Sequence, residues 1–450
     1  MDYQQAWDFL DSLQFFKIKL GLDSMNRFLA DLGNPHRQVR FVHIGGTNGK
    51  GSTGAALLSL LTTAGLRVGF YSSPHLSSVR ERFRLGRSLI PEADFARHAT
   101  AIRDVLNGRQ ITYFEFTTTL ALLWFAEQQV DPAILEVGMG GRLDATNVVT
   151  PLVTVITNVS MDHEQYLGTT LTAVAGEKAG IIKPGIPVVS AAAADASREV
   201  IETGCARQRS PLYLLGRDFN ARLAAASSRH WHYDGLGDEQ GRHRSWENLA
   251  LPGRGAHQAA NGALALATLE LLERKGFPCS EDQVRRGLAE TRWPGRMEEF
   301  WVDGRSRVYW RMPKRDGTPG PVVHYLLDGA HNPAGVEALK KCLQADFSYE
   351  NLHLIWAAMA DKDLAGTLSL IAPLAATVIL TRPESLRSAT PGELQDVLPP
   401  IAGQRVLKRP AVEEAVSLAA TFAGRNDLVC VAGSLYLVGR VRQILCGDMV

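Results

Sequence analysis

A lysine set among glycines is the first feature of this sequence that could do chemistry. Residues 45–53, GGTNGKGST, follow the β-branched run VRFVHI and precede an apolar segment rich in helix formers. Glycine lets a backbone approach phosphate closely, and a helix start offers unpaired N–H groups and the positive end of a dipole. Lys50 is then placed to reach the outer phosphates of a nucleotide. This order of strand, glycine turn and helix predicts a phosphate-binding loop.

The loop departs from the common pattern G-x-x-x-x-G-K-[ST] at two positions. Ile44 stands where that pattern has glycine, and Gly51 stands where it has a hydroxyl residue for magnesium. Part of a magnesium shell should therefore come from elsewhere in the chain. The alternative is an ordinary glycine-rich turn with a surface lysine.

Three side chains at the ends of predicted strands could supply that shell. Ser73 follows RVGFY, Glu136 ends the strand AILEV, and His163 follows PLVTVITNV. Open α/β sheets bind ligands at the carboxyl ends of their strands, and magnesium prefers oxygen ligands. Each residue also has a plainer interpretation. Ser73 can be a turn residue before proline, Glu136 can pair with Arg142 or a lysine, and His163 is a weak magnesium neighbour.

An aromatic pair beside a carboxylate opens the long apolar helix predicted after residue 111. Thr112, Tyr113, Phe114 and Glu115 stand at its start. Such a group could stack on a flat heteroaromatic ring and orient it, although core packing explains most aromatic residues at helix starts.

Size and composition narrow the class of protein. A chain of 450 residues is too long for one ordinary core and predicts two domains, 1–297 and 298–450, with turn residues near Arg296 at the boundary. Hydrophobic content of 45% and charged content of 21% indicate a globular protein. The balance of 48 Lys and Arg against 47 Asp and Glu gives no support for binding to nucleic acid or to a membrane through bulk charge.

The cysteines and the N-terminus bear on the compartment. The five cysteines are scattered and never form a C-x-x-C pair, which argues against a disulfide framework or a zinc site. The first residues lack the basic start and apolar core of a secretory signal, and no run is apolar enough to span a bilayer. We expect a cytoplasmic protein.

The alternation of strands and helices predicts an α/β fold with a mostly parallel sheet around the phosphate loop. Residues 3–32 read as amphipathic helices with a break near Gly21, and residues 216–251 read as a small appended antiparallel sheet with a hairpin tip at 234–241. Beyond Arg296, the runs HYLLDGA, LHLIWAAM, ATVILT and VCVAG predict a second, smaller Rossmann-like parallel sheet. Asp328 and His331 lie on the loop after the first of these strands.

Taken together, several motifs resemble the folylpolyglutamate synthase and dihydrofolate synthase family, within the Mur ligase superfamily. In chain order they are HIGGTNGKGST, YSSPHL, TYFEFTT, LEVGMGGRLDATN, NVSMDHEQYLG, EKAGIIKPG, HQAAN, WPGR and LDGAHNP. The resemblance implies an ATP-dependent ligase that joins the carboxylate of a folate or pteroate to the amino group of L-glutamate through an acyl phosphate.

The resemblance also implies roles for individual residues. Lys178, which would otherwise pass for an ordinary helix lysine, matches a lysine that becomes N6-carboxylysine in the family. Ser73, Glu136 and His163 would hold Mg²⁺, with two ions expected. The residues implied for ATP are Thr47, Asn48, Gly49, Lys50, Gly51, Ser52, Asn261, Arg296, Asp328 and His331. Those implied for the pterin ring are Thr112, Tyr113, Phe114, Glu115, Leu143, Asp144 and Ala145. Lys50, Lys178, His163 and Arg296 would be the catalytic set.

Within this family we expect a monomeric, bifunctional enzyme whose substrates are dihydropteroate, reduced folate and L-glutamate. The TYFEFTT segment favours a dedicated dihydropteroate pocket. The alternatives are a folylpolyglutamate synthase that only extends the glutamate tail, and another Mur-type ligase that adds amino acids to a cell-wall precursor. A phosphate-loop binding module without ligase activity is the rival from a different class.

Overall fold

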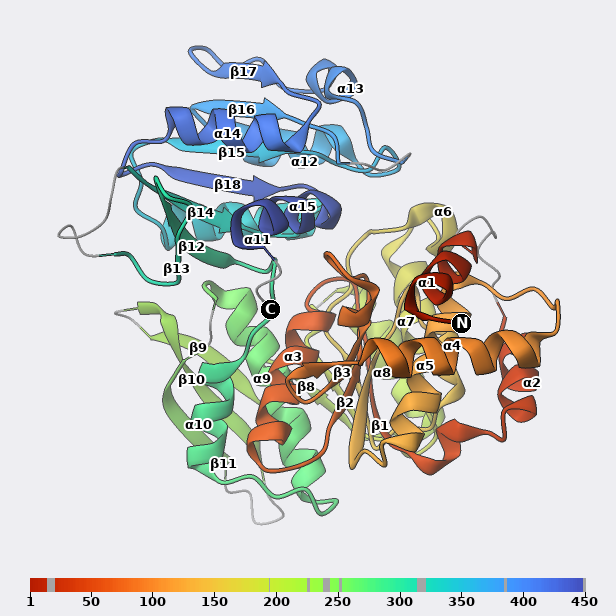
Figure 1. Ribbon diagram of the computed structural model, residues 1–450. Helices are drawn as coiled ribbons and strands as arrows, with labels where there is room; N and C mark the ends of the chain where they lie inside the picture. Colours follow the sequence, from red (N-terminus) through yellow and green to blue (C-terminus); the bar gives the residue numbers. More distant parts are fainter. Residues whose placement is uncertain are drawn as a thin grey trace. The chain divides into compact units, whose positions relative to one another are not determined.

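The computed structural model describes residues 1–13, 21–193, 195–224, 227–237, 243–250, 253–313, 321–383 and 387–447 (Figure 1). It divides into two compact units. The first comprises Met1–Pro252 with Ala256–Arg292, and the second comprises Gly253–Gly255 with Trp293–Val450. The WPGR motif therefore belongs to the second unit. Part of the predicted hairpin tip at 234–241 lies outside the described residues.

An eight-stranded sheet forms the centre of the first unit, in the order β4-β3-β2-β5-β1-β6-β7-β8. Six of these strands pair in parallel, whereas β3 pairs antiparallel with β2 and with the edge strand β4. The strands are β1 (Arg40–Gly45), β2 (Gly69–Tyr71), β3 (Phe83–Leu85), β4 (Ser88–Leu89), β5 (Pro132–Glu136), β6 (Val153–Ile156), β7 (Val188–Ser190) and β8 (Leu212–Leu214). β1 pairs with β5 on one side and β6 on the other, so the glycine loop leaves the interior of the sheet.

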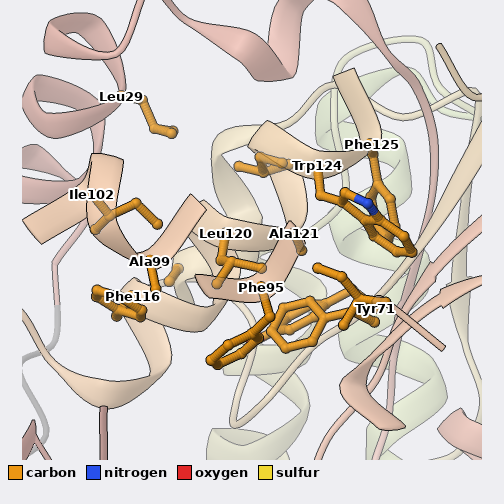
Figure 2. Close-up of a cluster of buried hydrophobic side chains, with 14 of the residues drawn as sticks. Leu29, Tyr71, Phe95, Ala99, Ile102, Phe116, Leu120, Ala121, Trp124 and Phe125 are labelled. Carbon is orange, nitrogen blue, oxygen red and sulfur yellow. The ribbon is translucent and has the colours of Figure 1, made fainter. Parts of the chain in front are cut away.

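Helices cover this sheet and bury its apolar side chains. They are α1 (Tyr3–Ser12), α2 (Asp23–Asp31), α3 (Lys50–Thr63), α4 (Glu92–Leu106), α5 (Tyr113–Glu127), α6 (Glu164–Leu167), α7 (Leu171–Ala179), α8 (Ala196–Gln208), α9 (Ala256–Glu273) and α10 (Glu281–Glu290). One large cluster joins α1, α2, α4 and α5 to β1, β2 and β5; Figure 2 shows its aromatic and aliphatic side chains. The break predicted near Gly21 falls between α1 and α2, where residues 14–20 lie outside the described part of the chain.

Gly54 marks the closest approach of α3 to the sheet. A Cβ atom at Gly54 would lie 2.5 Å from Cζ of Phe70, a fully buried ring on β2. We expect Gly54→Ala to lower the free energy of unfolding by about 1–3 kcal/mol through overpacking, although alanine is the better helix former. Chemical denaturation would measure this. Gly176→Ala in α7 is the matched control, because no atom lies within 4 Å of a Cβ there. A Gly54→Ala protein as stable as the control would contradict the expectation.

The predicted antiparallel sheet is confirmed in the first unit. It has three strands in the order β11-β10-β9, namely β9 (Asn220–Ala224), β10 (Ser227–Gly237) and β11 (His243–Ala250). Tyr233 stacks on Trp246 within this sheet and donates a hydrogen bond of 2.7 Å to Glu270 of α9. The small sheet is thereby fastened to a long buried helix.

The second unit contains a seven-stranded sheet in the order β13-β12-β14-β18-β15-β16-β17. Its strands are β12 (Glu298–Asp303), β13 (Val308–Tyr309), β14 (Val322–Leu327), β15 (Leu352–Trp356), β16 (Thr377–Leu380), β17 (Arg405–Lys408) and β18 (Leu428–Ala432). The predicted parallel strands are present, but β12 and β13 add an antiparallel edge to them. The helices are α11 (Pro333–Ala345), α12 (Leu364–Ile371), α13 (Pro391–Asp396), α14 (Val412–Phe422) and α15 (Leu435–Cys446). Among the helices of the described residues, none is both long and apolar enough to cross a membrane.

Candidate active site

The glycine loop has the shape that close approach to phosphate requires. Gly46 and Gly49 have φ values of 135° and 84°, and α3 begins directly after Gly49. A Cβ at Gly46 would lie 1.9 Å from Oγ1 of Thr157, and one at Gly49 would lie 2.3 Å from Oδ1 of Asn261. Both positions therefore exclude other residues by space as well as by backbone conformation. Asn261, which is distant in the sequence and was predicted to contact the nucleotide, lies against this loop.

The end of β6 holds the loop in place. The backbone N–H of Thr47 donates to the carbonyl of Asn158 at 2.9 Å, and that of Asn48 donates to the side chain of Asn158 at 2.9 Å. Thr157 donates from its hydroxyl to the carbonyl of Asn48 at 2.6 Å. Sequence reasoning missed Thr157 and Asn158 as supports of the loop. The polar pair Thr-Asn directly after a buried strand was the available signal.

Two lysines converge on one carbonyl oxygen of the loop. Lys50 donates from Nζ to the carbonyls of Gly46 and Thr47 at 3.1 and 3.0 Å. Lys178 of α7 is buried and donates from Nζ to the same Gly46 carbonyl at 3.0 Å. Burial, and after it the charge of Lys50, lowers the pKa of Lys178 to about 7. A large share of this amine is thus unprotonated near neutral pH, which is the form that can take up carbon dioxide.

Ser73 and Glu136, two of the three predicted metal ligands, lie next to each other. The backbone N–H of Ser73 donates to Oε2 of Glu136 at 3.3 Å, and Glu136 is only 4% exposed. Arg142, considered as a partner for Glu136, instead forms an ion pair with Glu177. A buried carboxylate near a hydroxyl residue fits Mg²⁺, which keeps several waters and phosphate oxygens in its shell.

His163 has a more open position than the other two predicted ligands. It precedes α6 with a φ of 51°, and its side chain is 36% exposed, with Nε2 4.0 Å from Oδ1 of Asp162. Among the described residues, no three His, Cys, Asp or Glu side chains form a group that could hold a metal by themselves. A metal here would need oxygen atoms from serine, water or substrate.

The start of α5 is built by two of the residues predicted to contact the ring. The Thr112 side chain accepts from the N–H of Glu115 at 3.1 Å, and the Glu115 carboxylate accepts from the N–H of Thr112 at 2.9 Å. Glu115 also accepts a hydrogen bond from Ser24 of α2. These two side chains thus cap the helix and tie it to α2, a folding role that the sequence reasoning did not assign.

Phe114 at this helix start packs against Gly138, whereas Tyr113 lies under an arginine. Phe114 lies so close to Gly138 that a Cβ there would be 2.4 Å from its Cζ atom. The Arg82 guanidinium stands over the Tyr113 ring at 5.2 Å from its centroid. The first predicted ring-binding segment, 112–115, therefore lies next to Gly138, five residues before the second predicted segment, 143–145.

Asp144 organises the loop between those segments. Its Oδ2 atom accepts from the N–H groups of Gly138 and Met139 at 3.0 and 2.9 Å. Its Oδ1 atom accepts from the N–H of Thr146 at 3.0 Å and from the Thr146 hydroxyl. Burial raises the pKa of Asp144 despite these donors. Leu143 and Ala145 flank this carboxylate in the chain, so they are positioned by the same loop.

Three predicted nucleotide residues gather in the second unit. Asp328 accepts from the N–H of Met297 at 2.8 Å and from that of Ala330 at 2.9 Å, so it joins the WPGR turn to the loop after β14. Arg296 packs on Gly329, where a Cβ would lie 2.3 Å from its Nη1 atom. His331 lies on the same loop with Nδ1 2.8 Å from the carbonyl of Gly329.

A neighbouring loop that sequence reasoning missed adds Ser434 to this region. β14 and β18 are adjacent parallel strands, and the N–H of Gly433 donates to the carbonyl of Ala330 at 2.9 Å. Asn332 and Ser434 are the N-caps of α11 and α15, so two helix N-termini lie at one edge of the sheet. Such termini favour anions. The small-residue turn AGS after the buried strand LVCVA was the signal in the sequence.

Comparison with known families matches both parts of the chain. The Mur ligase middle domain family matches residues 44–269, and the Mur ligase glutamate ligase domain family matches residues 310–435. The dihydrofolate synthase/folylpolyglutamate synthase of Bacillus subtilis is 32% identical over 455 residues, covering 98% of this chain and 99% of that protein. A solved structure of Escherichia coli FolC in complex with DHPP and ADP has a TM-score of 0.84 and 30% identity, covering 99% of this chain and 97% of that chain.

A further relative is longer than this chain. The protein named "Probable bifunctional folylpolyglutamate synthase/dihydropteroate synthase" of Haloferax volcanii is 34% identical over 454 residues, which are 98% of this chain and 50% of that protein. This chain thus spans about half the length of that relative.

The glycine loop, the two α/β units and the matched domains define a Mur-type ligase, an enzyme class that forms amide bonds with ATP. Within this class, the chain belongs to the folylpolyglutamate synthase and dihydrofolate synthase family. The predicted family and fold class are thereby confirmed.

Proposed function

We propose that this protein adds L-glutamate both to dihydropteroate and to reduced folates, through an acyl phosphate. The observation that supports the proposal is that the candidate phosphate-binding residues and the candidate ring-binding residues belong to the same unit. Lys50 and Lys178 meet at the glycine loop, and Asp144, whose loop lies against Phe114, contributes to the electrostatic environment of Lys178. The E. coli structure in complex with DHPP and ADP supports a nucleotide and a second small molecule as ligands of a protein of this family.

The chemical problem is that a carboxylate resists attack by an amine. Its negative charge repels the nucleophile, and oxide is a poor leaving group. Transfer of the γ-phosphoryl group of ATP to a carboxylate oxygen gives an acyl phosphate and ADP, which removes both obstacles. The amine of glutamate then attacks the acyl carbon, and phosphate departs with the electron pair of the C–O bond. Phosphoryl transfer depends mainly on positioning and on stabilising charge.

The loop of the first unit has the groups for that task. The N–H groups at the start of α3 would face the phosphates, and the Lys50 ammonium would offset the charge that develops on the transferred group. Thr47, Asn48, Gly51 and Ser52 complete the proposed phosphate-binding segment, with Asn261 against Gly49.

Mg²⁺ would be held by Ser73, Glu136 and His163, and we expect two ions. The ions would neutralise phosphate charge when bound. A carboxylated Lys178 would add a negative group where the unmodified side chain is a cation, and its lowered pKa supports that modification. The side chains and backbone of the protein would orient the nucleotide and hold the ring substrate.

We also assign roles to the second unit. Arg296 and Asp328 would contribute to nucleotide binding, with His331 beside them on the loop after β14. The N-termini of α11 and α15, with Ser434, would suit a carboxylate of the incoming glutamate. The match to a glutamate ligase domain at residues 310–435 supports that choice of substrate.

Product analysis by mass spectrometry tests the proposal. With ATP and glutamate, dihydropteroate should gain one glutamyl residue and a reduced folate should gain further ones. Formation of amide with the reduced folate alone would limit the protein to folylpolyglutamate synthase. Absence of amide product with either acceptor would overturn the proposal, and turnover of a UDP-sugar peptide in their place would assign the protein to cell-wall synthesis.

A further inference from the structure

A fully buried histidine on β1 takes part in no step proposed above. His43 is 0% exposed, and its Nε2 atom lies 2.8 Å from Oγ1 of Thr146. Within the described parts of the chain, the Nδ1 atom of the same ring has no hydrogen-bond partner. Burial, and after it the charge of Lys183, lowers the pKa of His43 to about 3, so the ring is neutral. A buried ring nitrogen without a hydrogen bond lowers the stability of the folded state. The presence of His43 at this position therefore needs an explanation.

The directions of the hydrogen bonds around His43 can be worked out. The Thr146 hydroxyl has one proton, and it donates that proton to Oδ1 of Asp144. Both oxygens of Asp144 already face N–H donors, which favours the ionised carboxylate as an acceptor. His43 must therefore donate from Nε2–H to Thr146. The result is one chain of donors that runs from His43 through Thr146 to Asp144.

This series of hydrogen bonds ends at Asp144, in the loop that lies against Phe114. Asp144 holds the N–H groups of Gly138 and Met139, and Gly138 is the residue against which the Phe114 ring packs. All three members of the chain are buried, with Asp144 7% exposed, so water does not compete for these hydrogen bonds. A change at His43 or Thr146 would reach the ring-binding loop through Asp144.

We propose that His43 and Thr146 are positioning residues that fix the shape of the 138–146 loop for the ring of the pteroate or folate substrate. The inference rests on the proposed function, and it goes beyond that function by naming two residues that would not touch the substrate. Because the chain ends at Asp144, its loss should weaken binding of the ring substrate more than binding of the nucleotide.

The test compares variants that keep or remove one hydrogen bond. Thr146→Val keeps the shape of the side chain and loses the hydroxyl, whereas Thr146→Ser keeps the hydroxyl. His43→Leu loses the donor, whereas His43→Gln keeps an N–H donor. Calorimetry gives the dissociation constants for dihydropteroate and for ADP, steady-state kinetics gives KM and kcat, and thermal unfolding checks that each variant is folded.

We expect Thr146→Val and His43→Leu to weaken dihydropteroate binding about tenfold, with the ADP dissociation constant unchanged. Thr146→Ser and His43→Gln should restore most of the affinity. The double variant His43→Leu/Thr146→Val should bind dihydropteroate no more weakly than the single variant with the lower affinity. Both substitutions break the same series of hydrogen bonds.

Three outcomes would overturn the inference. They are equal losses of dihydropteroate and ADP binding, unchanged dihydropteroate binding in both apolar variants, and additive effects in the double variant. Failure of the proposed function looks different. In that case the unaltered protein itself would bind neither dihydropteroate nor a reduced folate and would form no amide, and the inference would fall with it.

Discussion

Replacing Lys50 with alanine should abolish ATP-dependent phosphate release in the presence of dihydropteroate and glutamate. The Lys50 amine stands at the start of α3 over the carbonyls of Gly46 and Thr47, where it would meet the outer phosphates. Loss of one preorganised group that stabilises transition-state charge typically costs about 10²–10³ in kcat, and we expect at least that loss here. A coupled phosphate assay with ADP binding measured in parallel would show whether chemistry or affinity is lost.

The matched control is Lys341→Ala, which removes a mostly exposed cation on α11. It should leave phosphate release unchanged. Thermal unfolding of Lys50→Ala should resemble that of the unaltered protein, because the Gly46 carbonyl keeps its hydrogen bond from Lys178. Normal turnover by Lys50→Ala would refute the assignment of the phosphate loop.

Lys178→Met should eliminate ligase activity and yet stabilise the protein below neutral pH. In the folded state the pKa of Lys178 is lowered from 10.5 to about 7, chiefly by burial. Between these two values the unfolded chain binds more protons at this site, so stability rises with pH across that window. Below about pH 7 the amine is protonated in both states, and the full cost of burying the cation is present. The lowering of the Lys178 pKa corresponds to a free-energy cost on the order of 5 kcal/mol for the protonated side chain.

Urea unfolding of the two proteins between pH 6 and pH 10, in metal-free buffer purged of carbon dioxide, checks the stability expectation. The advantage of Lys178→Met should be largest at the acid end and should shrink toward the alkaline end. A constant difference across this range would mean that Lys178 is not a buried amine of lowered pKa. Carbon-13 NMR after addition of labelled bicarbonate would detect a carbamate in the unaltered protein only.

Much of the first unit could be predicted because its signals are local. The strand VRFVHI, the turn GGTNGKGST and the helix after it are adjacent in the sequence, so their order already predicts the strand, tight turn and helix that the structure contains. The antiparallel sheet was predicted from the short polar and aromatic pattern of residues 216–251 for the same reason. In the second unit, the alternation of strands and helices predicted the parallel strands but not the antiparallel pairing of β12 and β13 with them.

What could not be predicted depends on contacts between distant residues. Lys178 looks like any helix lysine until α7 packs it against the Gly46 carbonyl. Thr112 and Glu115 were predicted from their types as ring contacts, whereas their side chains mainly cap α5. The residues that touch the substrate remain a prediction, because sequence patterns identify side-chain types and leave their partners open.

The meeting of two lysines on the Gly46 carbonyl has one more consequence. The shared acceptor is a main-chain atom, which every amino acid possesses, whereas the backbone turn that aims it is open only to glycine. The separation between the two amines is therefore dictated by the course of the polypeptide and not by any side chain at that position. The backbone at Gly46 therefore sets the position of the acceptor that both amines share. Replacing this one glycine would displace the amines of Lys50 and Lys178 together.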